Sequence, residues 1–142
     1  MDAARIDQYI ERVSLFDGLK REEVAKIFAK GMTMHVVAGE DIFVKGTIGN
    51  QMYVVLGGKL AVFDGKKCLA ELRTGDMFVE MALVNKEPRS ATVTAVNDSR
   101  LFVLSETTFE RLMTKRAAIK ILLNIVRTLS HRLKDANKRY IS

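Results

Sequence analysis

The chain contains no tryptophan, one proline, one cysteine and two histidines among its 142 residues. The single cysteine, Cys68, excludes an internal disulfide framework and an iron–sulfur cluster held by several cysteines of one chain. His35 and His131 lie in different parts of the sequence, so the ligands of a histidine-rich metal centre are also missing. Cys68 lies in a predicted strand, "KKCLAEL", with no general base nearby in the sequence, and we expect it to pack in the core.

Long apolar runs are also missing, as is a charged N-terminal segment followed by an apolar one. We therefore expect no membrane span, no secretion signal and a cytoplasmic protein. The composition, 48% apolar and 28% charged residues, is typical of a soluble globular protein, and the length predicts a single domain over residues 1–142. Neither a nucleophile–base pair nor paired carboxylates at catalytic spacing are recognisable, which argues against an enzyme.

The sequence divides into three zones, of which the first, residues 1–31, is predicted to be helical. Its apolar residues recur at helical spacing until Gly18 interrupts them. The segment "KREEVAKIFAK" then places its apolar residues on one face, which predicts a second short helix that ends near Gly31.

The second zone, residues 32–104, contains short β-rich runs separated by turn signals. Gly57-Gly58, between "QMYVVL" and "KLAVF", predicts a tight hairpin, and Asp64-Gly65 predicts another turn. About seven or eight strands at this spacing favour a sandwich, barrel or jelly roll over a βαβ sheet.

The third zone, residues 105–142, is predicted to form one long helix. Ser105 is a candidate N-cap, and neither proline nor glycine interrupts the chain from there to Tyr140. Its apolar residues step alternately by three and four positions, as in a coiled-coil seam: Ile119, Leu122, Val126, Leu129, Leu133, Ala136 and Tyr140. This seam predicts a homodimer; packing of the helix on its own β-domain is the alternative.

The net charge of +6 is concentrated in this last helix, where basic residues far outnumber Glu110 and Asp135. A basic helix can meet nucleic acid or an anionic membrane, although a solvated outer face is the commoner explanation. The sequence shows no helix-turn-helix after it, which argues against nucleic-acid binding.

The stretch "FVEMALVNKEPRSATV", residues 78–93, combines features of a nucleotide site. The segment that starts at Glu80 is predicted to form a short helical turn whose free N–H groups suit an anion. Arg89 can fork onto a phosphate, Ser90 adds a hydroxyl, and Glu80 can accept hydrogen bonds from ribose hydroxyls. Alternatively, Glu80 only complements the helix dipole, or Glu80 and Arg89 pair with each other.

The same stretch resembles the phosphate-binding cassette of cyclic nucleotide-binding domains, F-G-E-[LM]-A-L, a short loop, then P-R-[ST/A]-A. "VVAGEDIFVKGTIGNQMYVVLGGKLAVF" resembles the first half of that family's β-roll, and the closing helix resembles the dimerising C-helix of catabolite-activator-type regulators. The resemblance covers about Phe16 to Asn137. It implies a mainly β fold, a double-stranded β-helix (jelly-roll β-roll), with N-terminal helices, a cassette at 75–93 and a long C-terminal helix.

The resemblance also implies a ligand, cAMP or cGMP, and the residues that hold it. Arg89 would pair with the cyclic phosphate, and Glu80 would take the ribose 2′-hydroxyl. Ser90 and the backbone N–H groups of Met81 and Ala82 would complete the phosphate and sugar contacts.

The C-helix would cover the base, with Arg132, Ala136 and Asn137 near the positions that reach it. Val79 stands where the family has glycine, and valine resists positive φ and carries a branched side chain. Two hypotheses result. The first is a cyclic nucleotide sensor that signals to an unknown effector protein by C-helix rearrangement. The second is a degenerate module that acts as a dimeric interaction scaffold without ligand.

Overall fold

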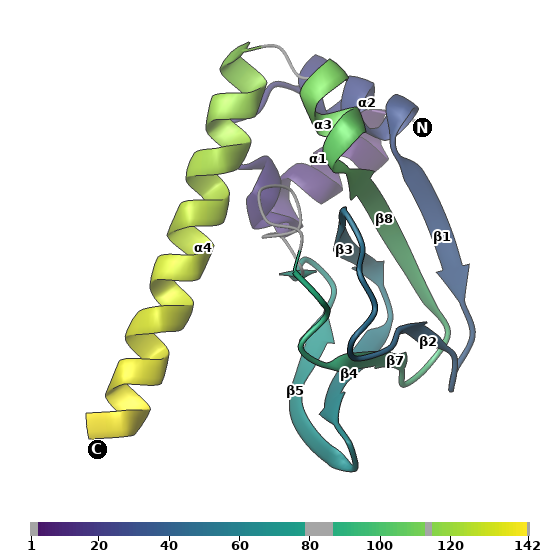
Figure 1. The fold of residues 1–142 in the computed structure, drawn as a ribbon. Coiled ribbons are helices and arrows are strands. Elements are labelled where there is room, and N and C mark those ends of the chain that lie inside the picture. Colours follow the sequence, from purple (N-terminus) through teal and green to yellow (C-terminus); the bar gives the residue numbers. More distant parts are fainter. Residues whose placement is uncertain (1–2, 79–86, 113–114, 142) are drawn as a thin grey trace.

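The computed structural model describes residues 3–78, 87–112 and 115–141. Three short helical segments precede the strands (Figure 1): α1 (Ala3–Arg12), the 3-10 turn η1 (Ser14–Phe16) and α2 (Arg21–Lys30). The predicted helical zone and its end are confirmed, because the N–H of Gly31 donates to the carbonyl of Ile27 at 2.9 Å as α2 ends. Within the described ranges, no helix combines the length and the apolar character that a bilayer crossing needs.

Eight strands, all within the described residues, form two four-stranded sheets in the orders β1-β8-β3-β6 and β2-β7-β4-β5. Neighbouring strands are antiparallel. The arrangement confirms the predicted mainly β fold, a jelly-roll β-roll with flanking helices. In chain order the strands are β1 (Met32–Val36), β2 (Asp41–Phe43), β3 (Gln51–Gly57), β4 (Lys59–Asp64), β5 (Lys67–Arg73), β6 (Met77–Phe78), β7 (Thr92–Ala95) and β8 (Ser99–Ser105).

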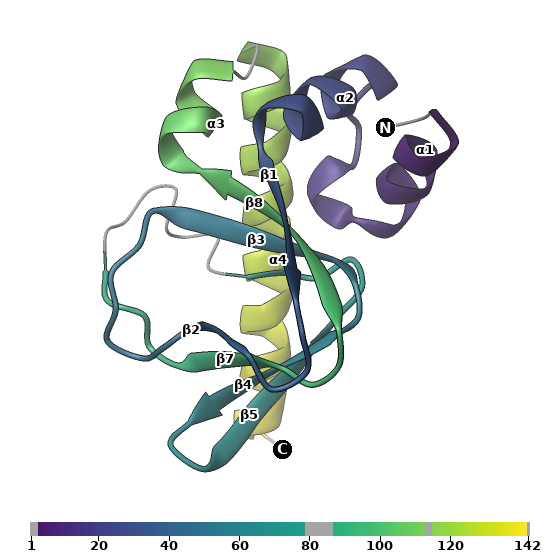
Figure 2. The same ribbon diagram turned by 90° about the vertical axis from the view of Figure 1, so that its right-hand side faces the viewer.

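Alternation along β8 divides the core into two clusters. Phe102 and Leu104 pack with the N-terminal helices, whereas Leu101 and Val103 face the interior of the roll. This division follows from the period of two along a strand, which sends successive side chains to opposite faces. Figure 2 shows the helices of the N-terminal zone gathered at one end of the roll, with the last helix running along its length.

The hairpin predicted at Gly57-Gly58 is wrong. β3 and β4 belong to different sheets, so the chain turns a corner here instead of pairing the two strands. Gly58 has φ of 98°, and a Cβ built on it would lie 2.7 Å from the Cα of Ser99. Glycine is therefore required for a close backbone approach as well as for the backbone conformation. The turn at Asp64-Gly65 is confirmed, because β4 and β5 pair with each other on either side of it.

The single long helix predicted after Ser105 is also wrong, because the chain forms α3 (Glu106–Leu112) and α4 (Lys115–Ile141). The two helices run in different directions in Figure 1 and contact different elements. Phe109 of α3 joins the helical core cluster near α2, whereas α4 packs beside η1. The predicted N-cap is confirmed, since the N–H of Thr108 donates to Oγ of Ser105 at 3.1 Å.

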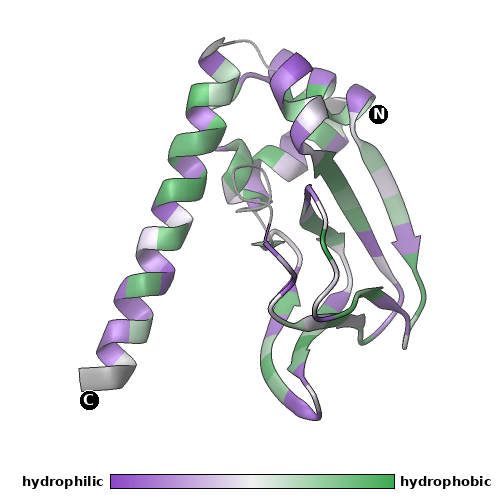
Figure 3. Ribbon diagram, in the orientation of Figure 1, coloured by the Kyte–Doolittle hydropathy of each residue, from purple (hydrophilic) through white to green (hydrophobic). Residues whose placement is uncertain are grey.

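α4 buries one face and leaves another exposed. The buried face consists of Ala117, Ile121, Asn124 and Ile125. The predicted seam lies mostly on the exposed side, where Ile119, Val126 and Leu133 are 57%, 60% and 63% exposed. Figure 3 shows hydrophobic and hydrophilic residues alternating along α4. The seam is therefore available for a partner, as a coiled-coil helix requires.

Cys68 does not pack in the core as expected. It is exposed on β5, the edge strand of its sheet, and its Sγ lies 3.6 Å from the carbonyl oxygen of Ala70. The sequence pattern was misleading because β5 is exposed along most of its length, so its apolar residues do not mark a buried strand.

Candidate functional site

The backbone of Arg89 is held against the loop between β2 and β3. Its N–H donates to the carbonyl of Thr47 at 2.7 Å, and the N–H of Gly46 donates to the carbonyl of Arg89 at 2.8 Å. Pro88, just before it, forms an isolated bridge with Ile48. Proline at this position restricts the backbone, and the paired hydrogen bonds then fix where the Arg89 side chain leaves the chain.

The Arg89 side chain is buried, with 6% of the residue exposed. Its Nη2 donates to the carbonyl of Gln51 at 3.2 Å, and its guanidinium carbon lies 4.7 Å from the centre of the Phe43 ring. A Cβ added to Gly49 would come within 2.6 Å of Nη2, so glycine makes room for the guanidinium. Among the described residues no carboxylate forms an ion pair with Arg89. A buried cation of this kind is a strong candidate for an anion-binding group.

Tyr53 lies close enough to Arg89 to be affected by its charge. Its ring stacks on Phe78 with centroids 5.0 Å apart, and its hydroxyl lies 3.3 Å from Oε1 of Gln51. Burial raises the pKa of Tyr53 above its usual value, although the nearby positive charge of Arg89 opposes the shift. The phenol therefore stays neutral at physiological pH and cannot neutralise Arg89.

A cavity of about 450 Å³ opens between the roll and α4. It brings together two predicted site residues from separate elements, Ser90 before β7 and Arg132 on α4. Arg89 is not among the lining residues but contacts Phe43, which is. The described lining residues are Phe43, Val62, Ala70, Glu71, Leu72, Asp76, Phe78, Ser90, Ala91, Val93 and Arg132. A mostly apolar cavity with a few polar groups is the usual form of a small-molecule site.

The predicted residues of α4 differ in position. Arg132 reaches back to the roll, where its Nη2 donates to the carbonyl of Met77 at 2.7 Å. Asn137 is exposed one and a half turns further along α4 and is not among the lining residues. Ala136, between them, is exposed as well. The structure thus brings Arg132 to the cavity and leaves Asn137 outside it.

The predicted residues Val79, Glu80, Met81 and Ala82 lie outside the described residues. The structure therefore does not test the helical turn expected there, the effect of valine in place of glycine, or the alternative pairing of Glu80 with Arg89. The described chain reaches Phe78, a cavity-lining residue of β6, immediately before this segment.

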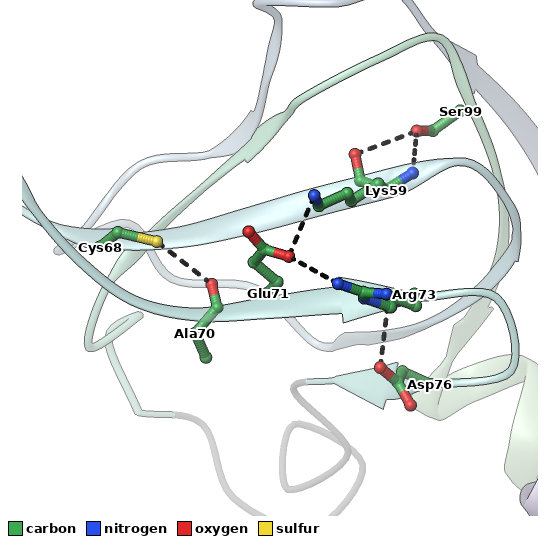
Figure 4. A network of polar contacts seen from close by, with 7 residues as sticks. All are labelled: Lys59, Cys68, Ala70, Glu71, Arg73, Asp76 and Ser99. Carbon is green, nitrogen blue, oxygen red and sulfur yellow. Dashed lines mark hydrogen bonds and ion pairs between the residues drawn. The ribbon is translucent and has the colours of Figure 1, made fainter.

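A polar network borders the cavity (Figure 4). Lys59 and Arg73 approach the same oxygen of Glu71, at 3.1 and 3.2 Å, and the N–H of Arg73 donates to Asp76 at 2.9 Å. Hydrogen bonding from Lys59 and then from Arg73 lowers the pKa of Glu71. Glu71 is therefore ionised at neutral pH and already occupied, which favours a structural role at the rim of the cavity.

Sequence reasoning missed the walls of the cavity. Val62 pairs with Ala70, and Leu72 pairs with Leu60, so strand pairing brings these wall residues together. Alternation along β5 could not have identified the wall, because it groups Ala70 and Leu72 with the exposed Cys68. Phe43 could not have been found by alternation either, because β2 is only three residues long.

Nothing in the described part of the chain favours a metal site. No group of three or more His, Cys, Asp or Glu side chains converges among those residues. His35 lies on β1 and His131 on α4, so the two histidines belong to different elements of the fold.

Comparisons with known proteins agree with the fold. The solved catabolite activator protein of Thermus thermophilus superposes with a TM-score of 0.78 and 30% identity, covering 89% of this chain and 61% of that one. A cyclic nucleotide-binding domain from Methylobacillus flagellatus superposes with a TM-score of 0.83, covering 97% and 82% of the two chains. At 21% identity, the second shows the fold alone.

Two curated relatives are similar in sequence over part of their length. The cyclic AMP receptor protein of Thermus thermophilus is 31% identical over 128 residues, 87% of this chain and 58% of that protein. A cAMP-dependent protein kinase regulatory subunit of Hypocrea atroviridis is 31% identical over 107 residues, 75% of this chain but 23% of that protein. The chain therefore spans between about a quarter and somewhat over half of the relatives it matches.

The decisive comparison is with protein families. The family model described as the cyclic nucleotide-binding domain matches residues 33–116, which is more than half of the chain. This match includes the whole β-roll, the segment around Arg89 and Ser90, and the start of α4. The fold and the family match agree, and the chain belongs to the cyclic nucleotide-binding domain family.

Proposed function

We propose that this chain is a cyclic nucleotide sensor that binds cAMP or cGMP in the cavity between the roll and α4. The observation that carries the proposal is the meeting of Ser90 and Arg132 at one cavity, with Arg89 buried against its Phe43 wall. The cavity lies within the roughly 300–1,000 Å³ range of small-molecule sites. The names of the relatives, a cyclic AMP receptor and a cAMP-dependent kinase regulatory subunit, favour cAMP.

The chemistry of the residues assigns a part of the ligand to each. Arg89 supplies a desolvated cation for the cyclic phosphate, and Ser90 adds a hydroxyl beside it. The apolar side chains of Val62 and Leu72 suit the flat faces of a purine. By the family resemblance, Glu80 takes the ribose hydroxyl, and the backbone at Val79, Met81 and Ala82 completes the contacts.

Arg132 provides a route from the ligand to α4. Arg132 lines the cavity and donates a hydrogen bond to the carbonyl of Met77. Met77 lies two residues before Val79, which adjoins the glutamate of the cassette. A nucleotide that interacts more favourably with one placement of α4 than with another shifts the population toward that placement. Asn137 does not line the cavity, so it reaches the base only if α4 moves. The movement of α4 then transmits the signal to an effector protein.

Titration calorimetry with purified protein tests the binding. We expect both cAMP and cGMP to bind with a Kd of about a millimolar or tighter. 5′-AMP serves as the control ligand, because it has the same base and sugar but an open, dianionic phosphate, and we expect weaker binding. Absence of heat with either cyclic nucleotide, in protein shown to be folded, would contradict the proposal.

The second candidate function is a ligand-free interaction scaffold. The observation in its favour is Val79, which stands where the family has glycine. A Val79→Gly variant that gains cyclic nucleotide binding absent from the wild type would establish this alternative. Equal binding by the two proteins would remove valine as an obstacle.

We also propose a homodimer through the seam of α4. Its exposed apolar residues, Ile119, Val126 and Leu133, recur at heptad spacing along the helix. Exposed apolar residues in such a regular line are more consistent with a helix partner than with single scattered residues.

Sedimentation analysis of a Val126→Lys variant tests the dimer. A lysine in the seam would have to be desolvated at the interface, so we expect the dissociation constant of the dimer to rise about tenfold or more. Lys134→Ala, an exposed change on the same helix, is the matched control and should leave the equilibrium unchanged. A wild-type protein that is monomeric at all concentrations would overturn the proposal.

A further inference from the structure

A second cleft of about 510 Å³ lies on the outer face of the sheet that contains β1, β8 and β3. His35 pairs with Arg100 across β1 and β8, and Arg100 pairs with Gly57 across β8 and β3, so the three residues form a row. The two cavities share no lining residue. The cleft is lined by His35, Val36, Val37, Gly57, Gly58, Asp98, Ser99 and Arg100.

Arg100 is the unusual group in this cleft. Its Nη2 donates to the hydroxyl of Tyr9 at 3.1 Å, which fixes the guanidinium, and Tyr9 is itself held by stacking on Phe28. Its Nε is buried and has no hydrogen-bond partner among the described residues. None of the ion pairs in the described ranges includes Arg100. A buried donor without an acceptor is costly, and natural proteins rarely leave one without a reason.

The cleft is open at Gly57, the residue opposite Arg100 on β3. A Cβ built on Gly57 meets nothing within 4 Å, and the φ of Gly57 lies outside the left-handed region. His35 is exposed at the other end of the row and offers a second donor. A planar guanidinium carries five N–H donors in a geometry that matches carboxylates and phosphates.

We propose that this cleft binds an oxyanion, the phosphate or carboxylate group of a small ligand, through Arg100 and His35. The anion supplies the counter-charge that Arg100 lacks among the described residues, and its oxygens accept from the Arg100 guanidinium and from His35. The hydrogen bond to Tyr9 connects the guanidinium to helix α1. The site does not depend on nucleotide binding at the other cavity.

Asp98 sets a limit on the affinity, because its carboxylate also lines the cleft. Its Oδ1 accepts from the N–H of Ala38 at 3.0 Å, which explains its presence without a ligand. Asparagine can retain that acceptor while removing the negative charge. An Asp98→Asn variant should therefore bind the anion more tightly, by about fivefold from the Coulomb interaction alone.

Nuclear magnetic resonance of the full chain provides the test. Inorganic phosphate is titrated while the Nε–Hε signal of Arg100 and the amide signals of Gly58 and Ser99 are followed, with sodium chloride at equal ionic strength as the control. We expect saturating shifts with phosphate. Gly57→Leu fills the open space without backbone strain and should weaken the response by about tenfold or more. Arg89→Ala should leave it unchanged, since Arg89 belongs to the other site.

Sodium acetate distinguishes the two ligand groups. A response to phosphate alone assigns a phosphate group, and a response to both anions assigns a general oxyanion site that also accepts carboxylates. Shifts no larger than those caused by sodium chloride would overturn the proposal. Unchanged binding in both Gly57→Leu and Asp98→Asn would do so as well, because both variants act on the cleft without removing Arg100.

Discussion

Replacement of Arg89 by alanine should weaken cyclic nucleotide binding by about 100-fold or more, because two charge-assisted hydrogen bonds to a phosphate contribute roughly 1.5–3 kcal/mol each. The guanidinium is already desolvated and fixed by Phe43 and the Gln51 carbonyl, so little ordering cost remains for the ligand. Calorimetry with cAMP measures the effect.

Two further variants test two properties of Arg89 separately. One replaces the planar guanidinium while keeping the positive charge, and the other removes an arginine at a different position near the cavity. Arg89→Lys keeps a cation but loses the planar fork, and we expect an intermediate loss of affinity. Arg73→Ala removes an exposed arginine at the rim of the same cavity and should have little effect. Because Arg89 is buried, urea unfolding of each variant without ligand must show a folded protein. Folded Arg89→Ala with wild-type affinity would exclude Arg89 from the site.

Replacement of Asn124 by alanine should lower the free energy of unfolding by about 2–3 kcal/mol, because it leaves buried carbonyl groups without a donor. Asn124 is 3% exposed, and its amide nitrogen donates to the carbonyls of Leu15 and Asp17 at 2.8 and 2.9 Å. Its side-chain oxygen also accepts from Arg127 at 3.2 Å. One side chain thus fastens α4 to η1 and thereby sets where Arg132 meets the cavity.

Urea unfolding of Asn124→Ala and Asn137→Ala compares the same substitution at a buried and an exposed position of one helix. Asn137→Ala should be neutral or slightly stabilising, because alanine is the better helix former. Equal stability of the two variants would show that the hydrogen bonds of Asn124 contribute nothing net. In that case the position of α4 would have to depend on the apolar contacts of Ile121 and Ile125 alone.

A second anchor of α4 is electrostatic. Arg116 pairs with Glu23 of α2 and donates to the carbonyl of Gly18 at 2.9 Å. Burial alone would raise the pKa of Glu23, but hydrogen bonds from the Lys20 backbone and from Arg116 outweigh it, and the pKa lies below its usual value. Glu23 therefore remains ionised at neutral pH, and its contribution to stability is lost only as acid protonates it.

Local signals in the sequence were reliable where the interaction itself is local. Ser105 caps α3 through a residue three positions away, and the N–H of Gly31 donates to the carbonyl of Ile27, four positions back, where α2 ends. Arg89 and Ser90 were identifiable because a proline, a cation and a hydroxyl adjoin one another in the chain. Their roles in binding remain predictions, as do those of Glu80, Val79, Met81 and Ala82.

Where the sequence reasoning failed, the cause was an interaction between distant segments. The Gly57-Gly58 turn has the residues of a hairpin, but Ser99 of β8 occupies the space beside Gly58, and the strands diverge into different sheets. The unbroken helical pattern after Ser105 could not reveal two helices, because the elements that they contact, α2 for α3 and η1 for α4, lie far away in the sequence. Cys68 appeared apolar in its strand, yet nothing covers the edge on which it lies within the described residues.

By itself, the amino-acid sequence determined the class of fold and the small set of residues from which a site could be built. Period-two alternation, turn glycines and capping residues act over a few positions, so they are readable along the chain. Only the tertiary structure decided which of those residues meet: it brought Arg132 of α4 to the cavity of Ser90 and left Asn137 in solvent. It also placed Arg100 beside Gly57 and His35, a juxtaposition created by strand pairing between residues far apart in sequence.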